Sequence, residues 1–318
     1  MDAPPDTTSQ QRGVVTRIVI GYDMSAEADR AADIVARTTW PAGSLVRLVT
    51  SSSGIGEERS SFSGRESKLH AADVRAALAA AQERVTTLLA GAGLVADAVT
   101  VGGKPARAVV DHARTFGADL IVVGAQRRSS LASALLGSVS MDIAASAPCP
   151  VLIVRVEALE RVVLATDGSP AAAAAVDVVA SWPLFANAKL RVVGVAAPPS
   201  RYVAAVLDEV DDREAEELAA TRERTGAVVD ATVERLAAEG RRVVGDIRTG
   251  DAASEIVAAS DDWPADLVVL GSSDGSFVRR LVLGSVARNV AQAVNASVLV
   301  VRAPPDRRPA AAAAGEPR

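Results

Sequence analysis

Two stretches of the sequence combine glycine and serine in a pattern that can hold a phosphate group. Each follows a short apolar run, and their first glycines lie 147 positions apart. Glycine lets the backbone approach a ligand closely, while a helix that starts at Gly-Ser offers free N–H groups and a hydroxyl to an anion. The alternative needs no ligand, because serine also caps a helix that follows a strand. The residues concerned are Gly124, Gly137, Ser138 and Val139 in the first stretch, and Gly271, Gly284, Ser285 and Val286 in the second.

An aspartate follows the first apolar run of each half of the chain. Asp23 comes after RIVIGY, and Asp167 comes after RVVLAT. In an open parallel sheet a ligand binds beyond the carboxyl ends of the strands, which is where both aspartates are expected. The alternative is a turn residue that bonds the neighbouring backbone. The sequence leaves both interpretations open.

The elements that must position these residues alternate between strand and helix. Short β-branched runs bounded by turn residues are typical of buried strands, and we expect five in each half. Ser25 should cap the first helix of one half, and Ser169 with Pro170 that of the other. Parallel strands need crossovers that cover the sheet. The pattern therefore predicts an α/β fold of two tandem doubly wound domains, each a five-stranded parallel sheet flanked by helices.

The repeat also predicts the domain boundaries. We expect one domain at residues 13–156 and a second at 160–303, joined by too few residues for a flexible linker, so that the domains touch. Residues 1–12 and the Pro/Ala/Arg-biased residues 304–318 are expected to be disordered.

Composition argues against several classes of protein. The 318 residues hold 34 Lys and Arg against 39 Asp and Glu, a net charge of −5, and only 3% aromatic residues. Such a chain lacks the positive field and the stacking platforms that nucleic-acid binding uses. No apolar run is long enough for a membrane span or a signal peptide, so we expect a cytoplasmic protein without a membrane partner. Cys149, the single cysteine, should be a small buried filler.

No catalytic or metal-binding constellation is recognisable. His70 and His112, the two histidines, are expected on helices without a nucleophile motif nearby. No Cys, His and carboxylate cluster has metal spacing, although a nucleotide could bring Mg²⁺ with it. The segment GGKPA from Gly102 lacks the upstream glycine of a P-loop and has Pro105 where Ser or Thr must bind magnesium. We therefore expect no P-loop here.

The glycine stretches resemble those of the universal stress proteins. Nucleotide-binding members of that family carry a glycine, two residues, a glycine, nine residues and then Gly-Ser or Gly-Thr, and the spacing matches in both halves. The resemblance includes the aspartate after the first strand, the fourth strand ADLIVVG or ADLVVLG, and the closing PVLIVR. It spans roughly residues 14–302, so the chain looks like a tandem universal stress protein with a HUP-like nucleotide-binding fold.

This resemblance implies two ATP sites. Asp23 and Asp167 would lie beside the base and ribose, with the second-strand ends at Thr50 and Val195 close by. The backbone amides and serine hydroxyls of the glycine stretches would hold the phosphates. The fifth strands would lie at sheet edges if the family's strand order holds, so they need covering, and we expect the two domains, and a further copy of the chain, to pair there.

The middle glycine of the motif is replaced in both halves, by Arg127 and by Asp274. A side chain there costs on the order of 1 kcal/mol if the position needs a positive φ. Arg127 and Arg128 can supply charge to a phosphate, or they can be a solvated surface pair. Asp274 would repel a phosphate, and Gly275 can compensate in part.

Three functions remain open. The first is a stress-response regulator that binds ATP in one or both sites with no or slow hydrolysis. The second is a nucleotide-free protein that acts through dimerisation and partner binding. The third, an ATPase, lacks any recognisable base or nucleophile. If the first holds, valine in place of Gly124 or Gly137 should abolish nucleotide binding without unfolding the protein.

Overall fold

The structure, a computed structural model, describes residues 16–53, 64–125, 138–198, 212–272 and 283–302. Strands and helices alternate in the first half: β1 Arg17–Gly21, α1 Ala26–Arg37, β2 Leu45–Ser51, α2 Gly64–Gly91, β3 Val95–Val101, α3 Pro105–Phe116, β4 Leu120–Gly124, α4 Ser138–Ser146 and β5 Val151–Val154. The second half repeats the series: β6 Arg161–Ala165, α5 Pro170–Ser181, the short 3₁₀ helix η2 Pro183–Phe185, β7 Lys189–Ala196, α6 Asp212–Ala238, β8 Arg242–Thr249, α7 Ala252–Asp262, β9 Leu267–Ser272, α8 Ser285–Ala293 and β10 Ser297–Arg302.

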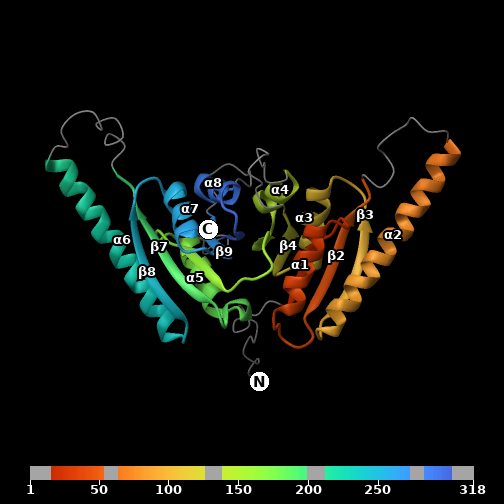
Figure 1. Cartoon of the computed structure of the whole chain (residues 1–318), viewed down its shortest axis with the longest axis horizontal. Coiled ribbons are helices and arrows are strands. Elements are labelled where there is room, and N and C mark those ends of the chain that lie inside the picture. Colours follow the sequence, from red (N-terminus) through yellow and green to blue (C-terminus); the bar gives the residue numbers. More distant parts are fainter. Residues whose placement is uncertain (1–15, 54–63, 126–137, 199–211, 273–282, 303–318) are drawn as a thin grey trace, which may run out of the picture.

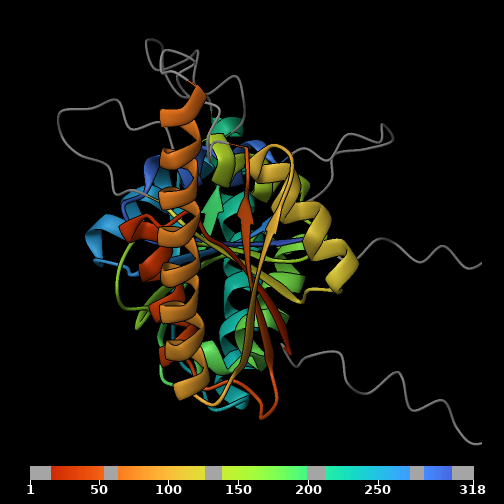
Figure 2. The same ribbon diagram turned by 90° about the vertical axis from the view of Figure 1, so that its right-hand side faces the viewer.

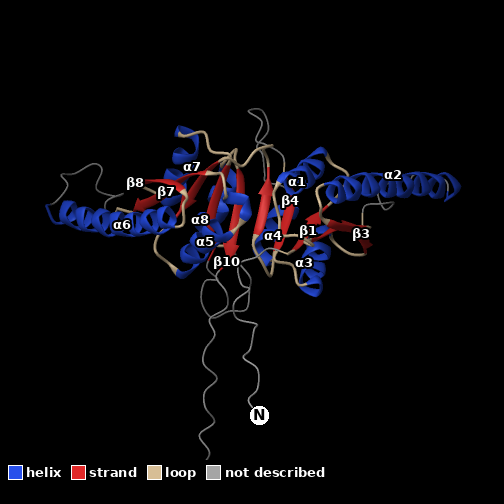
Figure 3. Ribbon diagram, turned by 90° about the horizontal axis from the view of Figure 1, so that it is seen from below, coloured by secondary structure: helices blue, strands red, loops and turns tan. Residues whose placement is uncertain are grey.

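The predicted fold class is confirmed, with one difference in how the strands are joined. Within each half the five strands are parallel, in the order β3-β2-β1-β4-β5 and its counterpart β8-β7-β6-β9-β10. The two sets do not form separate sheets, because β5 and β10 pair antiparallel and make one sheet of ten strands. Figures 1 and 3 show the two halves related by an approximate two-fold rotation about this central pair.

Helices cover both faces of the sheet, as parallel crossovers require. Successive strand residues point to opposite faces, so Ile18 and Ile20 pack in one core cluster with α1 and α2, while Val19 packs in the other with α3 and α4. The second half repeats this division, with α5 and α6 on one face and α7 and α8 on the other. Figure 2 shows α2 and α3 on opposite sides of the strands.

The helix starts follow the capping residues expected from the sequence. Ser25 Oγ accepts a hydrogen bond from the Ala28 N–H, and Ser169 Oγ accepts one from the Ala172 N–H. Pro170 is the first residue of α5, where its missing N–H costs nothing. These two caps fix the direction in which α1 and α5 leave the strands before them.

Two arginines tie the halves together beside the central strand pair. Arg155, at the end of β5, is 1% exposed and donates hydrogen bonds from Nη1 to the Ala296 carbonyl (2.8 Å) and from Nη2 to the Ala291 carbonyl (2.6 Å). Arg302, 147 positions later, reaches the carbonyls of Ala144 and Ala145 in the other half. Each arginine thus places its charge at the C-terminal end of a helix of the opposite half, where carbonyls are unpaired and a cation is favoured.

Among the helices that the structure describes, none is long and apolar enough to cross a membrane.

Candidate functional site

The predicted site residues that the structure describes lie at or after the carboxyl ends of strands in each half. In the first half β1 is flanked by β2 and β4, with Gly21 opposite Val49 and Val123. The chain winds from β1 outward to β3 and then returns to β4 on the other side, so the carboxyl ends of β1 and β4 form the switch point where ligands bind in such folds. The second half has the same order around β6.

Asp23 and Asp167 occupy equivalent turns just beyond these central strands. In each turn one carboxylate oxygen accepts a hydrogen bond from the backbone N–H two residues on, from Ser25 at 3.0 Å and from Ser169 at 2.9 Å. The turn interpretation of the two aspartates is therefore correct. Both side chains are nevertheless exposed, and a carboxylate has a second oxygen that can accept hydroxyl groups of a ligand.

The residue after each aspartate adopts a left-handed backbone conformation. Gly168 does so with φ of 76°, which glycine tolerates. In the first half the residue is Met24, with φ of 66°, and among the described residues it is the one non-glycine with a positive φ. Strained backbone of this kind concentrates at functional sites. The sequence analysis did not predict this strain. The alignment of Met24 with Gly168 was the signal that could have revealed it.

The two second-strand positions differ in character. Thr50 is 4% exposed, and its hydroxyl accepts a hydrogen bond from the side-chain amide of Gln82 on α2 at 3.1 Å. Val195, one position beyond Gly194, which is the register counterpart of Thr50, is half-buried against the core on the α7 side. Both lie next to the switch point by strand order, and the Thr50 hydroxyl already has a partner on α2.

Gly124 and Gly271 pack against a helix rather than against open space. A Cβ at Gly124 would lie 2.2 Å from the carbonyl carbon and oxygen of Glu27, and one at Gly271 would lie 2.3 Å from those of Ala171. The main chain of α1 or α5 therefore crosses directly over the end of β4 or β9. The expectation that valine at Gly124 would remove only nucleotide binding is wrong, because that substitution also forces the helix away.

Gly284 differs from these two glycines. It is the N-cap of α8 with φ of −54°, and no side chain caps the helix there. Among the described residues, a Cβ added to it would meet nothing closer than Ser272 Oγ at 4.0 Å. Ser285 and Val286 follow as the first helical residues, both exposed. Ser285 therefore begins the helix and does not cap it, so the ligand-free interpretation as a capping serine is wrong for α8.

A buried hydroxyl that the sequence reasoning missed lies beneath this helix start. Ser272 Oγ, 3% exposed, accepts a hydrogen bond from the Gly284 N–H at 3.3 Å. In the first half the aligned residue is Ala125, while Ser140 in the first turn of α4 donates to the Gly124 carbonyl at 3.4 Å. The helix α4 begins at Ser138, and both Ser138 and Val139 are exposed. Gly137, Arg127 and Asp274 lie outside the described residues.

Two titratable groups of the first half are held in their neutral forms. Tyr22, next to Asp23, is buried and donates a hydrogen bond to Asp29 at 2.9 Å; burial, together with that carboxylate, raises its pKa to about 12. Arg84 of α2 closes the network by bonding Asp29 at 3.0 Å. Cys149 is buried as expected, and burial raises its pKa to about 12, so its thiol is not a nucleophile at neutral pH.

The arrangement suits binding rather than bond making. Among the described residues, no group of three or more His, Cys, Asp or Glu side chains could hold a metal ion. His112 lies on α3, away from both aspartates, and burial followed by the charge of Arg47 lowers its pKa. Each half instead brings together an exposed carboxylate and an exposed helix start, which are suited to the hydroxyl groups and the anionic end of one ligand.

Comparison with known proteins gives consistent results for both halves. The model of the universal stress protein family matches residues 15–155 and again residues 158–302. Universal stress protein YxiE of Bacillus subtilis is 43% identical over 63 residues, and a universal stress protein of Thermus aquaticus is 46% identical over 59 residues. These alignments cover 20% and 19% of this chain and, in both cases, 43% of the relative.

Solved structures share the fold over nearly the whole chain. A universal stress protein from Archaeoglobus fulgidus matches with a TM-score of 0.64 and 17% identity, covering 91% of this chain and 97% of its own. A protein of unknown function from Pseudomonas aeruginosa matches with a TM-score of 0.60 and 18% identity, covering 91% and 93%. At such identities the likeness concerns the fold alone.

Proposed function

Because the chain belongs to the universal stress protein family, with a match in each of its halves, we propose that it is a stress-response regulator that binds adenine nucleotide, with no or slow hydrolysis. ATP is the proposed ligand, with Mg²⁺ accompanying it. Binding would change how the protein meets its partners. The cytoplasmic location and a dimer of the whole chain stay predictions.

The uncapped start of α8 beside Asp167 carries this proposal. No described residue crowds Gly284, so a ligand can approach its backbone from that side. The N–H groups of Ser285 and Val286 point out of the first turn, where the helix dipole favours an anion. Asp167 in the neighbouring turn keeps one carboxylate oxygen for ribose hydroxyls. A phosphate and a sugar recognised together are two of the three parts of a nucleotide.

The first half offers the same scheme with Asp23, Ser138 and Val139. Here Ala125 stands in place of Ser272, so the side chain that accepts a hydrogen bond from the Gly284 N–H has no counterpart. That difference favours tighter phosphate binding in the first half, because an amide already bonded to the protein has less to offer a ligand.

The test begins with the nucleotide content of the purified protein. After denaturation, the released small molecules are separated by chromatography against ATP, ADP and AMP standards and expressed as moles per chain. One or two equivalents of adenine nucleotide support the proposal. No nucleotide, together with a melting temperature that added ATP leaves unchanged, would favour the nucleotide-free, partner-binding alternative.

Variants then locate the binding. Asp23→Asn keeps the oxygen that bonds Ser25 but removes the charge, and Gly284→Val adds a side chain beside the start of α8. We expect ATP affinity, measured by calorimetry, to fall about tenfold in the affected half, equivalent to about 1.4 kcal/mol. Gly91→Val is the matched control, since a Cβ there meets no atom within 4 Å. Wild-type affinity in both site variants would contradict the site assignment.

A single-turnover assay addresses hydrolysis. Incubation of a slight excess of protein with labelled ATP should release no or little phosphate over several minutes. Rapid release that Gly284→Val abolishes would favour an ATPase instead.

A further inference from the structure

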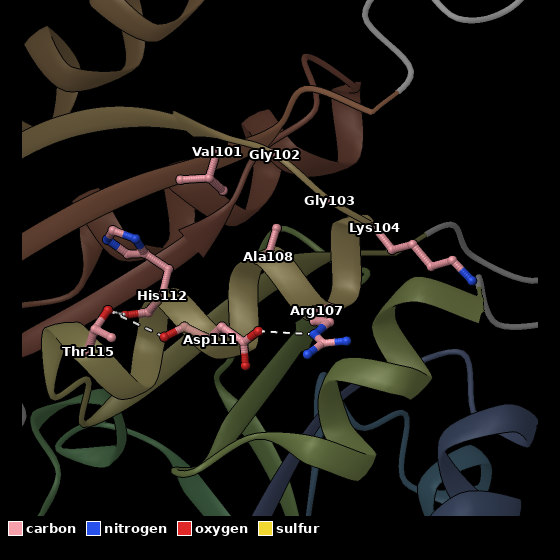
Figure 4. Close-up of a pocket in the computed structure, with 9 residues that line it drawn as sticks. All are labelled: Val101, Gly102, Gly103, Lys104, Arg107, Ala108, Asp111, His112 and Thr115. Atoms are coloured by element: carbon pink, nitrogen blue, oxygen red, sulfur yellow. Dashed lines mark hydrogen bonds and ion pairs between the residues drawn. The ribbon is translucent and has the colours of Figure 1, made fainter.

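A hollow of about 670 Å³ lies beside α3 in the first half of the protein (Figure 4). Its walls include Val101, Lys104, Arg107, Ala108, His112 and Thr115. None of its residues belongs to the candidate nucleotide site. Its volume falls in the range of pockets that hold small molecules.

The second half of the chain contains the equivalent position, with which this hollow can be compared residue by residue. Leu45 pairs with Val95 in the first half, and Lys189 pairs with Arg242 in the second, so residues of β3 correspond to residues of β8 that lie 147 positions later. The helices keep the same offset, because Lys104 is the N-cap of α3 and Asp251 is the N-cap of α7. Every wall residue therefore has a known counterpart.

In the second half a single arginine occupies the corresponding groove. Arg248 lies on the edge strand β8, and its side chain, 17% exposed, points toward α7. It forms ion pairs with three carboxylates. Its guanidinium nitrogens lie 3.1 Å from Asp246, 3.8 Å from Glu255 and 2.9 Å from Asp262. The groove is thus filled and its charges are paired from within the chain.

The first half lacks the arginine and all three of the carboxylates that fill this groove. Val101 stands in place of Arg248, and Val99, Ala108 and Thr115 stand in place of the three carboxylates. Because these side chains are shorter, a hollow stays between β3 and α3, and its walls are largely apolar. This difference involves one complete network rather than a single substitution.

The charges at the end of the hollow are also changed. Lys104 replaces the capping aspartate Asp251, and Arg107 replaces Ser254, which that aspartate binds. Lys104 makes no ion pair with any described residue, and no side chain caps α3. Arg107 is 84% exposed and pairs at 3.3 Å with Asp111, a carboxylate that Arg114 also contacts. Figure 4 shows Lys104 and Arg107 on one side of the hollow and His112 on the other.

We propose that this hollow is a second ligand site, which binds a small phosphate monoester with an apolar body. Lys104, Arg107 and the uncapped first turn of α3 meet the phosphate, since two cations and free amides together favour a doubly charged anion. Val101 and Ala108 contact the apolar body. The open end favours a small molecule that enters from solvent.

The test uses phenyl phosphate as the probe, with the full chain and saturating ATP present so that the nucleotide sites are filled. Nuclear magnetic resonance titration should shift the backbone amide signals of residues 102–104 and 106–108. The variant Lys104→Ala/Arg107→Ala should bind the probe at least about tenfold more weakly. The control Lys189→Ala/Arg224→Ala, which removes two exposed cations from the second half, should bind as the wild type does.

A variant in which larger side chains fill the hollow provides an independent test of probe binding. Val101→Arg/Ala108→Glu/Thr115→Asp builds the arginine and two of its three carboxylate partners into the first half. This variant should abolish the amide shifts at an unchanged melting temperature. If this variant does not fold, the alanine pair decides alone. Equal weakening by the control pair, probe binding that occurs only when ATP is left out, or wild-type binding by either hollow variant would overturn the proposal.

Discussion

Gly124 and Gly271 lie under the backbone of a helix, whereas no described atom lies closer than 4.0 Å to a Cβ placed on Gly284. This difference separates packing from binding within one motif. Gly124→Ala would bring a Cβ to 2.2 Å from the Glu27 carbonyl, a contact that no side-chain movement relieves. We expect a loss of about 3 kcal/mol in the free energy of unfolding, since an overpacked site must shift its backbone. Gly284→Ala should change stability by less than about 0.5 kcal/mol. Urea denaturation of both variants provides the measurement, and equal stabilities would contradict this account of Gly124.

Met24 carries a conformation that its counterpart Gly168 adopts without strain. Met24→Gly should raise the free energy of unfolding by about 1 kcal/mol, because a left-handed backbone costs a side-chain-bearing residue that much. Gly168→Met is the mirror control and should lower stability, since its Cβ would also lie 3.1 Å from Val228. A less stable Met24→Gly protein in thermal unfolding would show that the methionine side chain contributes more than its strained backbone costs.

At the scale of elements, the two equivalent helices α3 and α7 start in chemically different ways. Asp251 Oδ1 accepts a hydrogen bond from the Ser254 N–H at 2.9 Å, and this bond, with that from the Ser254 hydroxyl, lowers the Asp251 pKa below its ordinary value of 3.8. A carboxyl whose pKa is lower in the folded state stabilises the fold above its unfolded pKa. The contribution is lost as the pH falls through the lower folded pKa.

Asp251→Ala should therefore cost about 1 kcal/mol at neutral pH. The difference from the wild type should shrink once the pH falls below about 4. Lys104→Ala is the matched control, because Lys104 caps α3 without a side-chain hydrogen bond, and its effect should be small at every pH. Urea denaturation across this pH range measures both variants. A difference for Asp251→Ala that stays constant down to pH 3 would exclude the carboxylate as its source.

Much of the element order could be predicted because each signal is local. Ser25, Ser169 and Pro170 start helices through bonds within one turn, and β-branched runs are buried wherever helices cover both faces of a sheet. Contacts between distant segments could not be predicted in this way. The glycine spacing showed a motif, but that Gly124 supports α1 depends on where that helix crosses β4. The hollow beside α3 likewise required knowing that Val101 and Arg248 occupy one register position.

For the molecule as a whole, the sequence predicted two domains that touch, and the family resemblance placed the fifth strands at their joint. Neither predicted the geometry of that joint. The antiparallel direction of β5 against β10 and the role of the arginines depend on the rotation between the halves. Because the rotation is nearly two-fold, Arg155 and Arg302 each reach the opposite helix end. The result resembles the interface of a symmetric dimer, in which the same contact occurs twice.

Arg155 provides the test of this joint because it is buried where Arg302 is half-exposed. Arg155→Met keeps much of the side-chain volume but leaves the Ala291 and Ala296 carbonyls without their donor, and each unpaired buried carbonyl costs on the order of 1 to 3 kcal/mol. We expect the coupling between the halves to weaken, so that one calorimetric unfolding transition becomes two. Arg302→Met, the matched control, should shift the transition less, because the Arg302 side chain is only partly buried. A single transition at the wild-type temperature in Arg155→Met would mean that the central strand pair holds the halves together without the arginine.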